Sequence, residues 1–99
     1  MPRYLVIVRA DAAPFPAAQL QAIPRALARF AADGVALAFS DQSGGLAGLT
    51  IKSTASAAQL RAAVEQATAI TGRGFILALA LAEDFSAVVN SAGWRHLQH

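Results

Sequence analysis

The chain has 99 residues, no cysteine and a formal net charge of +2 at neutral pH. This length fits one domain that can bury a core unaided, and the lack of cysteine excludes disulfides and thiolate metal sites. Charged residues make up only 14% of the chain and apolar residues 56%, which predicts self-association because few charges keep the surface solvated.

The basic residues are scattered along the chain, which argues against a nucleic-acid partner. They are Arg3, Arg9, Arg25, Arg29, Lys52, Arg61, Arg73 and Arg95. The apolar run at residues 5–8 is too short for a signal peptide, and no run reaches membrane-spanning length. We therefore expect a cytoplasmic protein that does not contact membranes.

The first third of the chain predicts a strand followed by a helix. Tyr4 to Val8 is an apolar run rich in β-branched residues, which is typical of a strand. Pro14 and Pro16 end it, and apolar residues then recur at helical spacing from Ala17 to Phe30. Pro24 kinks this helix or begins a separate one. Asp33-Gly34 is the expected stop signal.

The middle of the chain predicts a hairpin. Residues 35–40 alternate, with Val35, Leu37 and Phe39 on one side and smaller residues on the other. Residues 41–45 have the composition of a turn, and Leu46–Lys52 alternates again. We therefore expect two antiparallel strands joined by a short turn.

A second helix and a last strand follow. Ser56 and Gln59 form a capping box, and Thr71-Gly72 is the predicted stop. In the run from Phe75 to Ala82 the odd positions are bulky and the even positions are mostly small. We expect the bulky side to face the core, because side chains alternate across a strand.

The resulting order is β-α-β-β-α-β, which predicts a ferredoxin-like α+β sandwich. Right-handed crossovers place both helices on one face of a four-stranded antiparallel sheet with strand order 4-1-3-2. This domain spans residues 1–83. Residues 84–99 are expected to form an extra C-terminal helical segment that packs on the domain or on a partner subunit, because they carry Phe85, Val88 and Trp94.

The other face of the predicted sheet is apolar enough to need a cover. We expect a second copy or the C-terminal segment to provide it, since small side chains permit close sheet packing. The predicted interface residues are Leu5, Ile7, Leu46, Ile76, Ala78, Ala80, Phe85, Val88 and Trp94.

Residues for catalysis are few. His96 and His99 are too few for a metal site without a carboxylate such as Glu83 or Asp84, and no cofactor motif is present. We therefore predict neither catalytic residues nor a metal or cofactor. The leading enzyme alternative is a small dimeric enzyme with a pocket near His96 and Tyr4. Residues 71–74 could hold an anion through Arg73, but a helix stop followed by the start of a strand explains them without a ligand and is the favoured interpretation.

Two families share this topology. RNA-binding domains of the RRM type stack bases on aromatic residues of the central strands, which this chain lacks on its third predicted strand. The stretch from Val6 to Val64 resembles an ACT domain at Asp11 and Pro14, although Phe15 occupies the place of that family's glycine. This resemblance implies a small-ligand sensor. The sequence favours a non-catalytic interaction or regulatory module that forms a homodimer, with the sensor and a weak nucleic-acid binder as alternatives.

Overall fold

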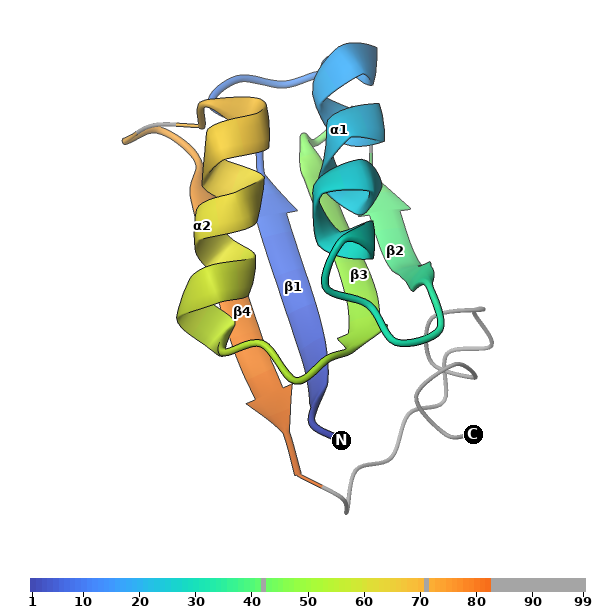
Figure 1. Cartoon of the computed structure of the whole chain (residues 1–99). Helices are drawn as coiled ribbons and strands as arrows, with labels where there is room; N and C mark the ends of the chain where they lie inside the picture. Colours follow the sequence, from blue (N-terminus) through green and yellow to red (C-terminus); the bar gives the residue numbers. More distant parts are fainter. Residues whose placement is uncertain (42, 71, 83–99) are drawn as a thin grey trace.

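The computed structural model describes residues 1–41, 43–70 and 72–82. They form two layers, with both helices on one face of a sheet (Figure 1). The elements are β1 (Arg3–Arg9), α1 (Ala17–Ala28), β2 (Val35–Asp41), β3 (Leu46–Lys52), α2 (Ala57–Thr68) and β4 (Phe75–Leu81). The described part of the chain is therefore an α+β fold with the predicted order of elements.

The four strands form one antiparallel sheet in the order β2-β3-β1-β4. Read from the opposite edge, this is β4-β1-β3-β2. The two central strands, β1 and β3, are adjacent along their full length, from Arg3 opposite Lys52 to Arg9 opposite Leu46. β2 and β4 are the edge strands.

The core lies between the sheet and the two helices. Val6 and Val8 from β1, Leu49 and Ile51 from β3, and Leu60 from α2 are all buried there. Phe15, in the segment that leads into α1, is also buried and closes one end of the core. Burial of these side chains provides the main driving force for the fold.

α1 is one helix that contains Pro24, so the alternative of a separate helix from Pro24 is wrong. It ends at Ala28, before the predicted stop at Asp33-Gly34. The chain tightens into short turns here, with the Phe30 amide donating to the Leu27 carbonyl at 3.0 Å. Asp33 and Gly34 lie instead in the loop before β2.

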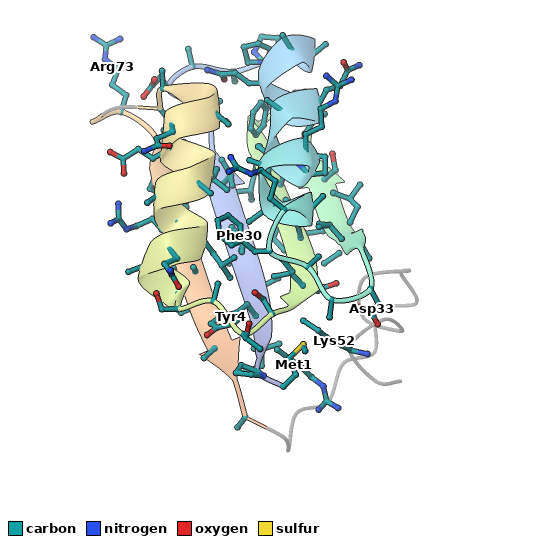
Figure 2. The ribbon with its side chains drawn as sticks, viewed as in Figure 1. Met1, Tyr4, Phe30, Asp33, Lys52 and Arg73 are labelled. Carbon is teal, nitrogen blue, oxygen red and sulfur yellow. The ribbon has the colours of Figure 1, made fainter. Side chains whose placement is uncertain are left out.

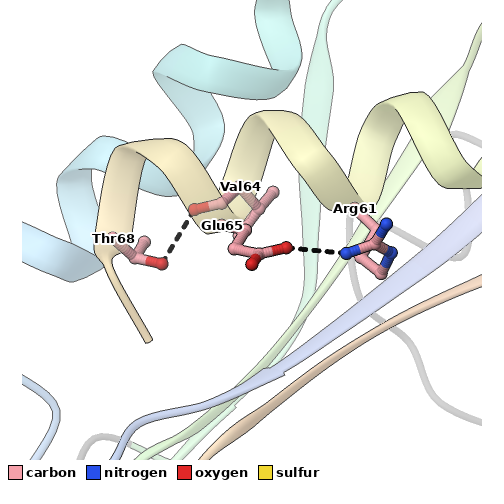
Figure 3. Close-up of polar contacts among 4 residues, drawn as sticks. All are labelled: Arg61, Val64, Glu65 and Thr68. Atoms are coloured by element: carbon pink, nitrogen blue, oxygen red, sulfur yellow. Dashed lines mark hydrogen bonds and ion pairs between the residues drawn. The ribbon is translucent and has the colours of Figure 1, made fainter. Parts of the chain in front are cut away.

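α2 begins with the predicted capping box. The Gln59 amide donates to Ser56 Oγ at 3.1 Å, and the Ser56 amide donates to Gln59 Oε1 at 2.8 Å. The helix ends at Thr68 rather than at Thr71-Gly72, because Ala69 takes a left-handed conformation with φ of 55°. Figure 3 shows the final turns, where Thr68 Oγ1 donates to the Val64 carbonyl at 2.8 Å.

The predicted C-terminal helical segment, residues 84–99, lies outside the described residues. Within the described ranges, neither helix has the length and apolar character needed to cross a membrane.

Candidate interaction surface

The sheet face opposite α1 and α2 is called the helix-free face below. Strand register identifies its residues, because side chains of directly paired residues lie on the same face. Leu5 pairs with Thr50 and Leu79, and Ile7 pairs with Gly48 and Leu77. The helix-free face therefore consists of Arg3, Leu5, Ile7, Arg9, Ala36, Phe39, Asp41, Leu46, Gly48, Thr50, Lys52, Phe75, Leu77, Leu79 and Leu81.

The predicted orientation of β4 is wrong. Its bulky residues Phe75, Leu77 and Leu79 are on the helix-free face and remain 43%, 44% and 39% exposed. Its smaller side faces the helices, where Ile76 and Ala78 pack against the core. α2 lies over this strand (Figure 1), and small side chains leave room for a helix to approach. The error makes the helix-free face more apolar than predicted.

The prediction that Phe39 lies on the same side of its strand as Val35 and Leu37 is also wrong. The pairing of β2 with β3 shifts between Leu37 and Phe39, which marks a bulge. A bulge inserts one extra residue and thereby reverses the facing of the residues beyond it. Leu37 pairs with the core residue Leu49, whereas Phe39 pairs with Gly48 on the helix-free face. The Phe39 ring lies directly over Gly48, where any side chain would collide with it.

The predicted interface residues thus fall into three groups. Leu5, Ile7 and Leu46 lie on the helix-free face, as expected. Ile76, Ala78 and Ala80 do not, because their pairing with Val8, Val6 and Tyr4 places them on the helix side. Phe85, Val88 and Trp94 lie outside the described residues. Phe75, Leu77 and Leu79 were missed, although the same alternating pattern contains them.

The charged groups of this face lie at the two ends of the strands. Arg3 and Lys52 are paired at one end, while Arg9 and Asp41 both pair with Leu46 at the other. Lys52 Nζ lies 3.7 Å from Asp33 Oδ2, and both labelled side chains appear beside each other in Figure 2. The middle of the helix-free face therefore carries no charge.

Asp41 is held by the hairpin turn. The Gly44 amide donates to Asp41 Oδ1 at 3.1 Å and Ser43 Oγ donates to it at 2.9 Å. These two contacts, the Gly44 amide first, lower the pKa of Asp41 below its ordinary value of 3.8. Because the folded pKa is depressed, this contribution to stability is present above the ordinary pKa and is lost as pH falls through the folded pKa. Asp41, the last residue of β2, therefore stabilises the hairpin turn.

Tyr4, the predicted member of an enzyme pocket, has a structural role. It is 6% exposed and faces the helices. Its hydroxyl donates to the Ala55 carbonyl at 2.8 Å, which links β1 to the loop before α2. His96 and Glu83, its proposed partners, lie outside the described residues, as does His99.

The segment before β4 is held by a hydrogen bond to the segment after β1. The Gly74 amide donates to Asp11 Oδ1 at 3.0 Å. Asp11 is the residue behind the ACT resemblance, and Gly74 belongs to the stretch considered for anion binding. The Gly74 amide is thus bonded to the Asp11 carboxylate of the same chain. The Arg73 side chain projects away from the body of the molecule (Figure 2).

A groove runs along the outer surface between α1 and α2, with a volume of about 720 Å³. Alanines make up half of its lining residues. Among its lining residues there is no histidine, carboxylate or hydroxyl, so these residues supply no general base. The lining consists of Ala18, Gln21, Ala22, Arg25, Ala26, Arg29, Phe30, Gln59, Ala62, Ala63, Gln66 and Ala67.

The described residues include no group of three histidine, cysteine or acidic side chains able to hold a metal ion. The chain matches no protein-family model, no curated protein and no solved structure. Arguments about function therefore depend on the geometry of the molecule.

Proposed function

We propose that this chain is a ferredoxin-like, non-catalytic interaction module that self-associates, with a second copy covering the helix-free face. The order of elements and of strands supports the fold assignment. The absence of cysteine is consistent with a reducing cytoplasm.

The observation that carries the proposal is the row of exposed bulky residues on β4. Phe75, Leu77 and Leu79 are 43%, 44% and 39% exposed on one face of one strand. Seven-residue strands about 4.8 Å apart, with about 3.3 Å per residue, give the sheet a footprint of roughly 400 Å². Part of this area is charged or already buried, since Leu5 is 9% and Thr50 0% exposed. The exposed apolar part lies along β4, and contiguous exposed apolar patches often mark interaction sites.

A second copy suits this face better than a polyanion or a substrate. The charged groups lie only at the ends of the strands, and the middle is apolar. The aromatic residues Phe39 and Phe75 belong to the edge strands, whereas base stacking in RRM domains uses the central ones. Two apolar sheets pack face to face at about 10 Å, which excludes water from both surfaces.

A charged substitution in the middle of this face tests the proposal. Ile7→Lys should about halve the mass of the native assembly in analytical ultracentrifugation, because pairing the faces would bury an uncompensated charge. Leu37→Lys is the matched control, since Leu37 is 48% exposed but lies on the other side of the sheet. The control should keep the assembly intact.

Circular dichroism should show both variants folded. A wild-type protein that stays monomeric at high concentration would overturn the proposal and favour cover by the predicted C-terminal segment, residues 84–99, of the same chain. Equal masses for Ile7→Lys and the wild type would also contradict it.

A further inference from the structure

Among the described residues, β4 is an edge strand whose own sequence and register lack the features that usually protect an edge. It pairs with β1 on one side, and no described strand pairs with its other side. Its sequence, Phe75-Ile-Leu-Ala-Leu-Ala-Leu81, has no charge and no proline, and its pairing with β1 shows no register shift. Edges of this kind tend to pair with another strand. β2, the other edge, has a bulge and ends in Asp41.

Hydrogen bonds at the ends of β1 establish which amides of β4 point outward. The Ala10 amide donates to the Gly45 carbonyl, and the Ser53 amide donates to the Pro2 carbonyl. Both contacts continue the register of β1 with β3, so the even residues of β1 point their backbone groups toward β3. The odd residues of β1 then point toward β4.

Those odd residues pair with the odd residues of β4, from Arg3 opposite Leu81 to Arg9 opposite Phe75. The amides and carbonyls of Phe75, Leu77, Leu79 and Leu81 therefore bond to β1. Those of Ile76, Ala78 and Ala80 point toward the free edge, because successive residues of a strand alternate.

We propose that β4 pairs with β4 of a second copy, antiparallel about a twofold axis at Ala78, to form one eight-stranded sheet. The inference rests on the proposed self-association and adds a second contact to it. In this register Ile76 faces Ala80 of the second copy and Ala78 faces its own counterpart. Each pair exchanges two hydrogen bonds, so about six bonds form in all.

The side chains suit this pairing. Leu77 of one copy would lie opposite Leu79 of the other on the helix-free face, in a close pair without backbone bonds. On the helix side, Ala78 would meet only its counterpart, and two alanines leave room for the two α2 helices. A twofold interface requires a self-complementary patch, and an uncharged strand meets that requirement without repulsion.

Amide hydrogen exchange tests the inference directly. At high protein concentration the amides of Ile76, Ala78 and Ala80 should exchange at least about tenfold more slowly than in dilute monomer. The amides of Leu77 and Leu79 should be protected at both concentrations, because they bond within the chain. Fast exchange at Ala78 that does not change with concentration would overturn the inference.

A proline substitution provides a second test. Ala78→Pro removes an amide that points outward, so it should halve the mass of the assembly while leaving the helical circular dichroism unchanged. Leu77→Pro, one residue away, removes a bond to β1 and should instead lower the melting temperature strongly. If Ala78→Pro is folded and keeps the wild-type mass, the edge contact does not form.

The two contacts can fail separately. If only the face contact exists, Ile7→Lys splits the assembly while the Ala78 amide exchanges fast at every concentration. If only the edge contact exists, Ile7→Lys keeps the wild-type mass and the Ala78 amide stays protected in that variant.

Discussion

At the scale of single residues, two glycines have close neighbours where a Cβ would stand, and neither is held by a positive φ. An added Cβ at Gly74 would collide with the Arg9 carbonyl oxygen and with Ile70. An added Cβ at Gly48 would collide only with the ring of Phe39. The first neighbour is backbone and cannot move aside, whereas the second is the end of a side chain.

These neighbours predict different costs for the same substitution. Gly74→Ala should destabilise the fold by about 2–3 kcal/mol, the upper part of the range for overpacking. Gly48→Ala should cost about 1 kcal/mol or less, because the Phe39 ring can rotate away. Chemical denaturation of both variants measures this difference. Similar costs, or the reverse order, would contradict the argument.

A Phe39→Ala variant is a control for the predicted cost of Gly48→Ala. In a Phe39→Ala background the ring is absent, so Gly48→Ala should no longer be destabilising through this contact. A double-mutant cycle between the two positions should therefore show a clear coupling, as expected for side chains in contact. The Gly74 position should show no coupling to Phe39.

At the scale of elements, α2 begins and ends by different kinds of interaction. The capping box of Ser56 and Gln59 satisfies amides at its first turn. At the other end Ala69 is left-handed, and its amide donates to the Glu65 carbonyl at 2.9 Å. On the exposed side, Arg61 Nη1 lies 2.6 Å from Glu65 Oε2 (Figure 3), a surface pair that adds little stability.

We expect the capping box of Ser56 and Gln59 to stabilise α2 more than the Arg61–Glu65 ion pair does. Ser56→Ala should lower the free energy of unfolding by about 1 kcal/mol, because the Gln59 amide loses its acceptor. Ser56→Asp keeps an acceptor at this position and should stay close to the wild type. Thermal denaturation followed by circular dichroism compares the three proteins. If Ser56→Asp loses as much stability as Ser56→Ala, the Ser56 hydroxyl stabilises the protein by something other than accepting the Gln59 amide.

The elements also show what the sequence could and could not predict. The capping box and the hairpin turn were predictable, because each depends on a few residues next to one another. The end of α2 was not, since Ala69 adopts a conformation that usually favours glycine. The facing of β4 was ambiguous, because both of its sides are apolar and alternation alone does not say which side meets the core.

At the scale of the whole molecule, the layered arrangement followed from the order of elements. The content of the helix-free face did not. One bulge in β2 moved Phe39 to that face, and the packing of α2 on the alanine side of β4 moved Phe75, Leu77 and Leu79 there. Both effects depend on contacts between segments far apart in the sequence, which a local pattern does not contain.

The apolar character of the proposed contacts predicts how association responds to salt. Raising sodium chloride from low to high concentration should leave the native mass unchanged or increase it, because burial of apolar surface does not depend on screened charges. Sedimentation across a salt series measures this. An assembly that dissociates as salt rises would point to contacts through Arg3, Arg9 and Lys52 instead.

Heparin chromatography serves as the companion measurement. Retention that falls steeply with salt would indicate a polyanion site at these three cations. Weak retention, together with an assembly that persists in salt, is the outcome expected here.

The bulge in β2 also limits how far such a molecule can grow. A sheet with two regular free edges can add neighbours at both sides and extend into a fibre. Here the irregular pairing between Leu37 and Phe39 leaves one regular edge, at β4. If β4 pairs with β4 of a second copy as proposed, no regular edge is left among the described strands, and the sheet is expected to stop at eight strands.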